Sequence, residues 1–352
     1  MALVLVLGLT VGAAFGGREV ARRWTAEAVA IRTPSGIDEA GFVRIDGQDQ
    51  WITIRGRDRR NPVLLVLHGG PGGAMSHLIA LMEPLERDYV VVQWDQPGAG
   101  RTLARAGGRI DPKLDIATMV RTGLGVSEHV SKRLGRDRIV LLGWSWGSFL
   151  GVRMAQARPD LYAAYVGTGQ AASAHPERDQ WDYTYLLAQA RAAGDGKALA
   201  VLQAVGPPPW KDRTAPQQLW RISGPYRGPM LSTADHAAAA LAAPHWTLAD
   251  VRVLAGGRAP FRTTVLEREV FAAEPDMAPV LPMPVVIIQG ERDTNTPTDH
   301  ARTWLARVRA PAKTFTVIPE AGHQALVTHN ATFTQALNAN LRPLLGVAPP
   351  VD

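Results

Sequence analysis

The sequence contains no cysteine among its 352 residues. This absence excludes disulfide bonds, a cysteine nucleophile, thiolate metal sites and an N-terminal cysteine that could carry a lipid. Charged residues amount to 20% and hydrophobic residues to 46%, which is the balance of a globular protein and not of a disordered chain. The net charge of +6 is scattered along the chain without a run of like charges, so we expect no nucleic-acid partner.

The N-terminus carries an uncharged stretch that is rich in leucine and valine. Residues 2–17 contain no charged side chain, but this run is shorter than the roughly 20 residues that cross a bilayer as a helix. Ala14 and Gly16 match the small-residue pattern of a signal-peptide cleavage site, whereas no basic residue precedes the run and three arginines follow it closely. We expect export or membrane anchoring through residues 2–17, with a cytoplasmic protein as the alternative.

The rest of the chain alternates between strand and helix patterns. Residues 42–45 and 51–54 alternate apolar and polar side chains around a turn at Gly47, which predicts an antiparallel hairpin. Continuous apolar runs then predict strands that are covered on both faces. Such strands are predicted at residues 63–67, 89–94 and 139–142, and further core strands at residues 163–166, 285–288 and 314–318. Helical spacing appears between them, over residues 116–134 and 149–157, so the pattern indicates an α/β fold with a mostly parallel, doubly wound sheet.

This alternation is lost in the middle of the chain. Residues 170–282 contain helical pieces, such as 185–193 and 234–241, together with several tryptophans and a run of three prolines. We therefore predict a core built from residues 40–169 and 283–345 and a mainly helical cap formed by residues 170–282. An open α/β sheet places its site at the carboxyl ends of the strands, so the cap is expected to cover those ends.

A serine nucleophile is predicted after the strand at residues 139–142. Gly143, Ser145 and Gly147 form the pattern GxSxG between a strand and a helix. A nucleophile on so sharp a turn adopts strained backbone angles, and its neighbours two residues away must be small. The helix that follows directs its amino end at the reacting oxygen. We predict that Ser145 attacks a substrate carbonyl.

A serine hydroxyl needs a base to remove its proton and an acid to orient that base. The loops after the last two predicted strands supply Asp293 and His323, so serine, aspartate and histidine follow one another in the order typical of this arrangement. We predict these three as the catalytic residues. The competing acids and histidines on the same segments are Glu291, Asp299, His300 and His329. The two competing histidines fall within helical stretches, where we expect solvated surface positions.

A tetrahedral intermediate requires hydrogen-bond donors for its oxyanion. One donor is the backbone N–H of Trp146, which follows the nucleophile. We assign the other to the N–H of Gly70, in the glycine-rich end of the strand at residues 63–67, because glycines let the backbone approach the substrate closely. We expect His68 to hydrogen-bond within this loop and not to act as a second base.

Three motifs together resemble those of the proline iminopeptidase group of α/β-hydrolases. They are His-Gly-Gly-Pro-Gly at residues 68–72, Trp-Asp-Gln at residues 94–96 followed by Gly98 and Gly100, and Gly-Trp-Ser-Trp-Gly-Ser at residues 143–148. The resemblance covers residues 61–169 and 284–330. It implies a hydrolase that releases N-terminal residues, preferably proline, through Ser145, Asp293 and His323 and without a metal or an organic cofactor.

The sequence departs from this group in two places. Pro97 and Thr102 stand where arginine and serine are usual, so the loop that braces the site is altered. These peptidases also resemble one another in holding the substrate's ammonium with cap glutamates, often within a Trp-Glu pair, and the sequence has no such pair. We take Glu177, which is close to Trp181 and Tyr185, as the candidate ammonium ligand, and Trp181 as a second candidate substrate-binding residue.

Three functions are compatible with these residues. An aminopeptidase for N-terminal proline or small residues comes first, because the set of motifs favours it. A carboxylesterase or amidase acting on small neutral substrates is the alternative, because a cap with many tryptophans and few glutamates suits apolar groups. A non-catalytic binding protein on the same scaffold is the least favoured. The expected partner is a small peptide or ester, and the sequence does not predict the oligomeric state.

Overall fold

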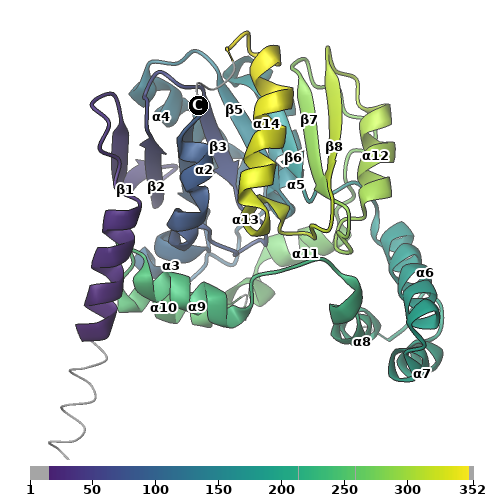
Figure 1. Ribbon diagram of the computed structural model, residues 1–352. Helices are drawn as coiled ribbons and strands as arrows, with labels where there is room; N and C mark the ends of the chain where they lie inside the picture. The colour runs from purple at the N-terminus through teal and green to yellow at the C-terminus, as the bar shows by residue number, and fades with distance from the viewer. Residues whose placement is uncertain (1–15, 213, 258, 349–352) are drawn as a thin grey trace, which may run out of the picture.

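The computed structural model describes residues 16–212, 214–257 and 259–348. At its centre lies an eight-stranded sheet with the strand order β1-β2-β4-β3-β5-β6-β7-β8 (Figure 1). The strands are β1 (Ile37–Ile45), β2 (Gln48–Gly56), β3 (Val63–Leu67), β4 (Val90–Asp95), β5 (Ile139–Trp144), β6 (Tyr162–Thr168), β7 (Val285–Gly290) and β8 (Lys313–Ile318). β2 pairs antiparallel with β1 and β4, and all the other neighbouring strands are parallel. The predicted fold class is confirmed.

The β1–β2 hairpin is longer than the sequence predicts. Its two-residue turn contains Asp46 and Gly47, which have φ angles of 50° and 77°, and the turn joins the paired residues Ile45 and Gln48. Two successive positive φ values match the twist of the flanking strands. β1 begins five residues earlier than predicted because it is an edge strand, whose solvated side chains do not produce an apolar alternation there.

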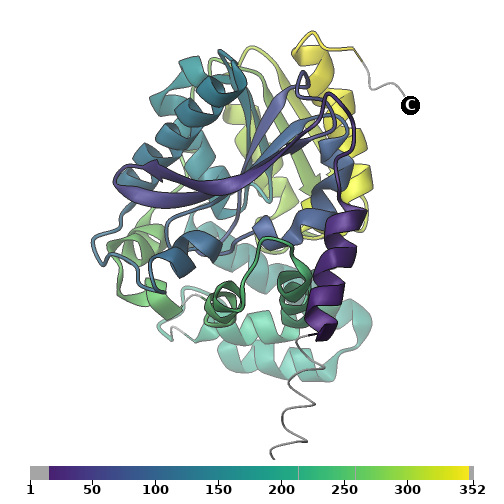
Figure 2. The same cartoon turned by 90° about the vertical axis from the view of Figure 1, so that its left-hand side faces the viewer.

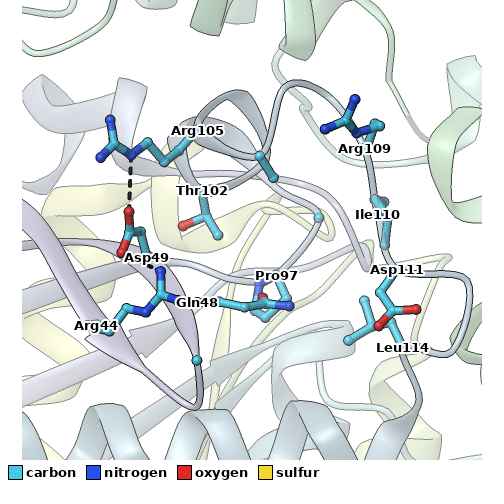
Figure 3. A pocket seen from close by; sticks show the side chains of 13 residues that line it. Arg44, Gln48, Asp49, Pro97, Thr102, Arg105, Arg109, Ile110, Asp111 and Leu114 are labelled. Atoms are coloured by element: carbon cyan, nitrogen blue, oxygen red, sulfur yellow. Dashed lines mark hydrogen bonds and ion pairs between the residues drawn. The ribbon is translucent and has the colours of Figure 1, made fainter.

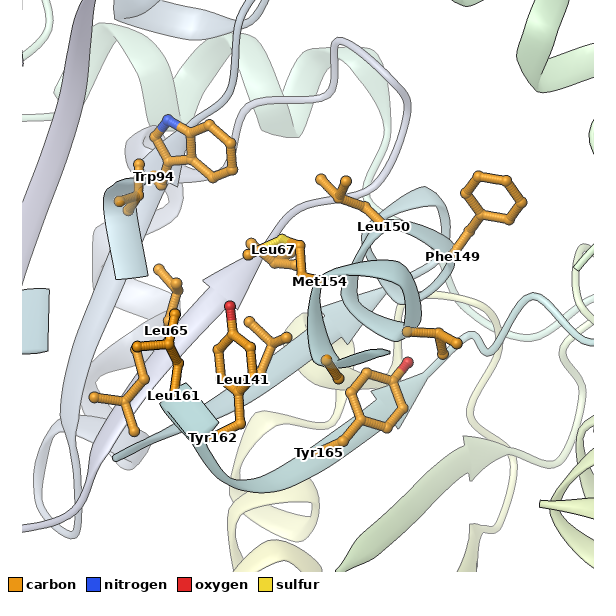
Figure 4. Packing of buried hydrophobic residues seen from close by; sticks show 14 of the residues in the cluster. Leu65, Leu67, Trp94, Leu141, Phe149, Leu150, Met154, Leu161, Tyr162 and Tyr165 are labelled. Atoms are coloured by element: carbon orange, nitrogen blue, oxygen red, sulfur yellow. The ribbon is translucent and has the colours of Figure 1, made fainter. Parts of the chain in front are cut away.

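The inner strands are buried on both faces of the sheet, as their continuous apolar sequences predict. In β3, Leu65 and Leu67 point into one hydrophobic cluster, and Leu64 and Val66 point into another. Figure 4 shows the first cluster, in which Leu65 and Leu67 face side chains from β5, β6 and α5 (Trp146–Ala157). This packing on two faces makes the inner strands a rigid base for the loops at their ends.

Helices cover both faces of the sheet. One face packs against α4 (Ile116–Leu134), α5 and α12 (Thr298–Arg307), and the other against α2 (Glu83–Glu86), α13 (Ala325–Thr328) and α14 (Asn330–Leu344). The helix predicted at residues 116–134 has those bounds in the structure. Asp115 caps its start by accepting a hydrogen bond from the N–H of Thr118, and Gly135 ends it in the left-handed conformation.

Between β6 and β7 the described chain forms helices in place of further sheet strands. These helices are α6 (His175–Ala193), α7 (Gly196–Val205), α8 (Ala215–Ile222), α9 (Thr233–Ala242), α10 (Leu248–Ala255) and α11 (Val265–Ala272). Figures 1 and 2 show them gathered at one end of the sheet. α3 (Gly100–Arg105), which follows β4, lies at this end as well and contacts α10.

A further helix over residues 16–28 precedes β1 and lies beside α9 and α10 in both views. Arg18 Nη2 donates a 2.7 Å hydrogen bond to the carbonyl of Trp246, and Arg22 donates one to the carbonyl of Pro244. The N-terminal apolar segment that the sequence predicts as a signal or anchor lies almost entirely outside the described residues. None of the described helices combines the length and the apolar character that crossing a membrane requires.

Candidate active site

Ser145 occupies a sharp turn between β5 and α5. Its backbone angles are φ 57° and ψ −123°, a conformation that a residue with a side chain rarely adopts. The turn requires small neighbours because the adjacent backbone is very close. A Cβ atom on Gly147 would lie 2.0 Å from the carbonyl oxygen of Leu67, and one on Gly143 would lie 2.5 Å from the carbonyl oxygen of Gly147. This packing accounts for both glycines of the GxSxG pattern.

The structure brings Ser145, His323 and Asp293 together at the ends of three parallel strands. Ser145 Oγ lies 2.9 Å from His323 Nε2, and His323 Nδ1 lies 3.0 Å from each oxygen of the Asp293 carboxylate. The three side chains therefore form one continuous hydrogen-bonded chain. Asp293 is 1% exposed and His323 is 7% exposed, so most of this chain is shielded from water.

The Asp293 carboxylate is held by donors from its own loop and from β7. Oδ1 accepts hydrogen bonds of 2.9 Å from the backbone N–H groups of Asn295 and Thr296. Oδ2 accepts hydrogen bonds from Thr296 Oγ1 at 2.8 Å and from Gln289 Nε2 at 2.9 Å. These donors compensate for the burial of the charge and fix the direction in which the carboxylate meets His323.

The competing acids and histidines lie apart from this chain. Glu291 and Asp299 are exposed. The expectation of solvated surface positions for the two histidines is wrong, since both are half-buried. His300 packs against the edge of Trp181, with ring centroids 6.2 Å apart, and His329 lies at the junction of α13 and α14. Tertiary packing covers both imidazoles, which helical spacing alone does not reveal.

The backbone N–H groups of Gly70 and Trp146 border the same cavity as Ser145. Trp146 is the first residue of α5, so its N–H has no partner within the helix and is available to a ligand. Gly70 has a φ of 127°, and a Cβ atom there would lie 2.6 Å from the nitrogen of Gly72. Gly69 leaves equally little room, because its Cβ would lie 3.1 Å from that of Ser145.

His68 holds the glycine-rich loop in place. Its Nδ1 lies 2.8 Å from the carbonyl of Gly69, and its Nε2 accepts a hydrogen bond of 3.1 Å from the N–H of Gln96. Burial lowers the pKa of His68 to about 4, so the ring stays neutral and keeps one donor and one acceptor near neutral pH. His68 therefore hydrogen-bonds within the loop region, as the sequence predicts.

Gln96 joins two segments of the site, a role that its place in the Trp-Asp-Gln motif does not predict. Its Nε2 donates to the carbonyl of His68 at 3.1 Å, and its Oε1 accepts from Trp146 Nε1 at 3.0 Å. One buried amide thus connects the loop after β3 with the start of α5. The two proposed oxyanion donors, which belong to these segments, are held in register by this contact.

Asp95, the middle residue of Trp-Asp-Gln, is fully buried beneath the cap. Its Oδ2 accepts hydrogen bonds from Ser76 Oγ at 2.9 Å and from the N–H of Arg101 at 2.8 Å. Burial raises the pKa of Asp95 to about 7, and these hydrogen bonds only partly oppose that rise. Thr102, one of the two departures from the family pattern, donates to the carbonyl of Asp95 and accepts a 2.9 Å hydrogen bond from the N–H of Trp51.

The cavity at Ser145 has a volume of about 320 Å³ and lies between the sheet end and the cap. Its walls are mostly neutral and include Phe149, Ala171, Val270, Ala273 and Pro275. Among the described residues that line it, Arg178 on α6 and His323 are the only ionisable side chains.

Neither Glu177 nor Trp181, the two cap residues predicted to bind substrate, lines this cavity in the described structure. Glu177 is exposed in the first turn of α6, and Trp181 stacks on Tyr185 with ring centroids 4.6 Å apart. Asp182 does not line the Ser145 cavity either, but it lines another, small cavity of about 50 Å³ together with Thr294. Burial raises the pKa of Asp182 to about 7, Arg178 opposes this rise, and the negative charges of Asp179 and Asp293 add to it. Asp182 is thus a cap carboxylate whose pKa responds in part to the charge of Asp293.

A separate cavity of about 250 Å³ lies against the β1–β2 turn, away from Ser145 (Figure 3). Pro97, the other departure from the family pattern, is part of its wall. Asp49 stands between Arg44 and Arg105 at this cavity and accepts a 3.1 Å hydrogen bond from each. The loop after β4 thus borders this cavity. Pro97 lines it and does not line the cavity at Ser145.

Comparison with known proteins agrees with this architecture. Residues 62–330 match the family model described as alpha/beta hydrolase fold. The match spans most of the sheet, the cap region and the loops that carry Ser145, Asp293 and His323. The chain belongs to the alpha/beta hydrolase fold family.

Individual relatives extend this comparison. The chain is 31% identical over 173 residues to a probable aminopeptidase, YbaC, of Bacillus subtilis, a match that covers 47% of this chain and 52% of that protein. It is 36% identical over 134 residues to a probable proline iminopeptidase of Streptomyces coelicolor, covering 38% and 40% of the two chains. The chain thus spans about half the length of these curated relatives or less. The crystal structure of a membrane phospholipase A shares the fold, with a TM-score of 0.63, 17% identity and 98% of each chain covered.

Proposed function

We propose that this protein is a serine hydrolase that works through an acyl-enzyme, and that it releases N-terminal proline or small residues from peptides. The observation that carries the proposal is the hydrogen-bonded chain from Asp293 through His323 to Ser145 Oγ, which ends in a cavity. A serine with an oriented imidazole base and nearby backbone N–H groups is equipped for nucleophilic attack on a carbonyl.

The first half-reaction forms the acyl-enzyme. Ser145 Oγ bonds to the substrate carbonyl carbon while its proton passes to His323 Nε2, and Asp293 stabilises the resulting imidazolium. The N–H groups of Gly70 and Trp146 donate to the oxyanion, and each such donor is worth roughly 3 kcal/mol in the transition state. Collapse breaks the carbon–nitrogen bond, and the proton on His323 moves to the departing amine. Water then repeats these steps and releases the acyl group from Ser145.

Relatives with aminopeptidase and proline iminopeptidase names support the peptidase assignment. An aminopeptidase also needs an anion for the ammonium of its substrate. We assign this part to Asp182 in place of Glu177, because Asp182 faces the region of Asp293 and Thr294 from the cap. A bound ammonium would stabilise the ionised form of Asp182 and offset the cost of its burial.

A carboxylesterase or amidase is the second candidate, and one observation favours it. The described lining of the Ser145 cavity contains no carboxylate, and most of its side chains are neutral or apolar. Such walls suit a small uncharged acyl group or alcohol.

Comparing three substrates separates the two candidates. A prolyl anilide with a free amine, its N-acetylated form and a short p-nitrophenyl ester would be assayed for kcat/KM. The peptidase predicts loss of rate on acetylation, and the variant Asp182→Asn should raise KM for the free amine alone. Equal rates for both anilides, with faster turnover of the ester, would reject the peptidase in favour of the esterase.

Ser145→Ala tests the shared mechanism. This variant should lose turnover of every substrate while keeping the unfolding midpoint of the parent protein. Ser173→Ala is a matched control, because Ser173 lines the same cavity without contacting His323 in the described structure. Undiminished activity in Ser145→Ala would refute the proposed function.

A further inference from the structure

The loop that carries His323 packs against the cap as well as against the sheet. Three glycines from different segments meet at this loop, namely Gly290 at the end of β7, Gly322 before the histidine, and Gly228 in the cap. A Cβ atom on Gly228 would lie 2.3 Å from the nitrogen of Gly322, and one on Gly290 would lie 2.3 Å from the carbonyl oxygen of Gly322. The residue next to the imidazole therefore contacts the backbone of both the sheet end and the cap.

Hydrogen bonds join the same part of the cap to the loops of the site. Segment 224–231 runs from α8 to α9 at the cap end of the sheet (Figure 1). The N–H of Leu231 donates a 2.6 Å hydrogen bond to Oε1 of Gln324, the residue that follows the proposed base. The N–H of Gly228 donates a 3.2 Å hydrogen bond to the carbonyl of Arg292, the residue that precedes the proposed acid. The segment thus contacts the neighbours of two of the proposed catalytic residues.

The other contacts of this segment connect it to three cap helices. The carbonyl of Tyr226 accepts a 2.8 Å hydrogen bond from the hydroxyl of Tyr185 on α6. The hydroxyl of Tyr226 donates one of 2.8 Å to Asp195, which caps the start of α7. The guanidinium of Arg227 lies 4.0 Å from the ring centroid of Trp220 on α8. The segment is therefore held by the cap at one end and holds the histidine loop at the other.

We propose that segment 224–231 positions His323, so that α6, α7 and α8 hold the base together with the sheet. This inference rests on the proposed function, because it concerns the base of that mechanism. The core supports the histidine through Trp144 Nε1, which donates a 2.7 Å hydrogen bond to its carbonyl, and the cap adds contacts at the residues on either side of it. Gly228 and Gln324 do not line the cavity at the nucleophile in the described structure, so they act through the histidine as positioning residues.

Gln324→Met tests the hydrogen bond between the segment and the loop. Methionine has a similar shape but offers only a weak acceptor, so the N–H of Leu231 loses its partner while the packing is kept. With a p-nitrophenyl ester, kcat should fall about tenfold and KM should change little, because a displaced base affects the transition state and not substrate binding. Gln156→Met is the matched control, since Gln156 is an exposed glutamine of α5 that bonds to Asp276, and its kcat should equal that of the wild type.

Gly228→Ala tests the backbone contact. The added Cβ forces Gly322 to move, and a displacement of about 1 Å at a catalytic group costs about 10²-fold in rate, so kcat should fall by about that factor. Gly196→Ala is the control in the same cap, because the space around its Cβ is open. If Gly228→Ala yields no folded protein, Gln324→Met decides the question alone.

The low-field proton resonance of the hydrogen bond between His323 Nδ1 and Asp293 gives a readout that needs no turnover. It should shift or broaden in Gln324→Met and in folded Gly228→Ala, and stay unchanged in the two controls. The inference is overturned if Gln324→Met keeps either the wild-type kcat or the wild-type resonance, even where its free energy of unfolding is lower. If the wild type turns over no substrate, the proposed function fails, and the resonance still decides whether the cap positions the imidazole.

Discussion

Replacing Asp293 by asparagine isolates the contribution of the acid to the proposed mechanism. The carboxylate accepts hydrogen bonds from two backbone N–H groups on Oδ1, and from Gln289 and Thr296 on Oδ2, and both oxygens meet His323 Nδ1. An amide cannot reproduce this pattern, because its NH₂ group must face other donors. If the NH₂ group turns towards His323, the imidazole must accept at Nδ1 and carry its proton on Nε2. That tautomer cannot remove the proton of Ser145.

The magnitude follows from the loss of the base. An acid-to-amide change that enforces the wrong tautomer lowers kcat by about 10⁴-fold in a serine triad, which corresponds to about 5.5 kcal/mol of activation free energy. The loss in unfolding free energy should be smaller, at about 1–3 kcal/mol, because one or two buried donors lose an acceptor.

Steady-state turnover of a p-nitrophenyl ester, together with urea unfolding, measures both quantities. Asp299→Asn is the matched control, since Asp299 is an exposed acid in the first turn of α12 and should affect kcat little. A kcat for Asp293→Asn within tenfold of the wild type would show that Asp293 does not orient His323.

Three further predictions concern folding and stability. Gly147→Ala should prevent folding, because the added Cβ would lie 2.0 Å from the carbonyl oxygen of Leu67. Gly41→Ala is the control and should give soluble protein, because the space around its Cβ is open. Equal yields of soluble protein from the two variants would contradict this packing. Asp95→Asn should remove part of the pH dependence of the unfolding free energy. The Asp95 carboxyl loses its proton near pH 4 in the unfolded protein and near pH 7 in the folded protein, so the native state binds more protons between these pH values. Wild-type stability should therefore fall by about 4 kcal/mol relative to the variant as the pH rises through that window, and parallel urea-unfolding curves would reject this. Glu86→Gln should cost about 3–5 kcal/mol in urea unfolding, because it leaves the buried Arg55 without its 2.9 Å ion pair, and a loss below 1 kcal/mol would show that Asp38 compensates.

Much of the core and of the candidate site could be predicted from local patterns. The continuous apolar runs mark β3, β4, β5 and β7, because strands buried on both faces need apolar side chains at almost every position. The predicted core strand at residues 314–318 is instead the edge strand β8, and its side chains are mostly half-buried. Ser145, Asp293 and His323 each follow a predicted strand, and the carboxyl ends of parallel strands meet at one edge of the sheet. The proximity of these residues at one edge of the sheet therefore follows from the sequence by geometry, whereas the order of the strands is known only from the structure.

The orientation of the cap carboxylates could not be predicted from local patterns. Glu177 and Asp182 both lie on α6, and their spacing of five residues places them about 140° apart around the helix. The sequence favours Glu177 because it is a glutamate near Trp181, but α6 turns Asp182 towards Thr294 and leaves Glu177 exposed. Only the packing of α6 against α7 and α8 in the tertiary structure sets this rotation.

The sequence alone determined the alternation of strands and helices, the strained serine turn and the order of the three proposed catalytic residues. These features depend on near neighbours in the chain and on the pairing rules of parallel strands. The tertiary structure decided which cap carboxylate lies near the site, how Gln96 joins the loop after β3 to Trp146, and which side of helix 16–28 stays exposed. Each of these depends on contacts between segments far apart in the chain, whose relative rotation no local pattern encodes.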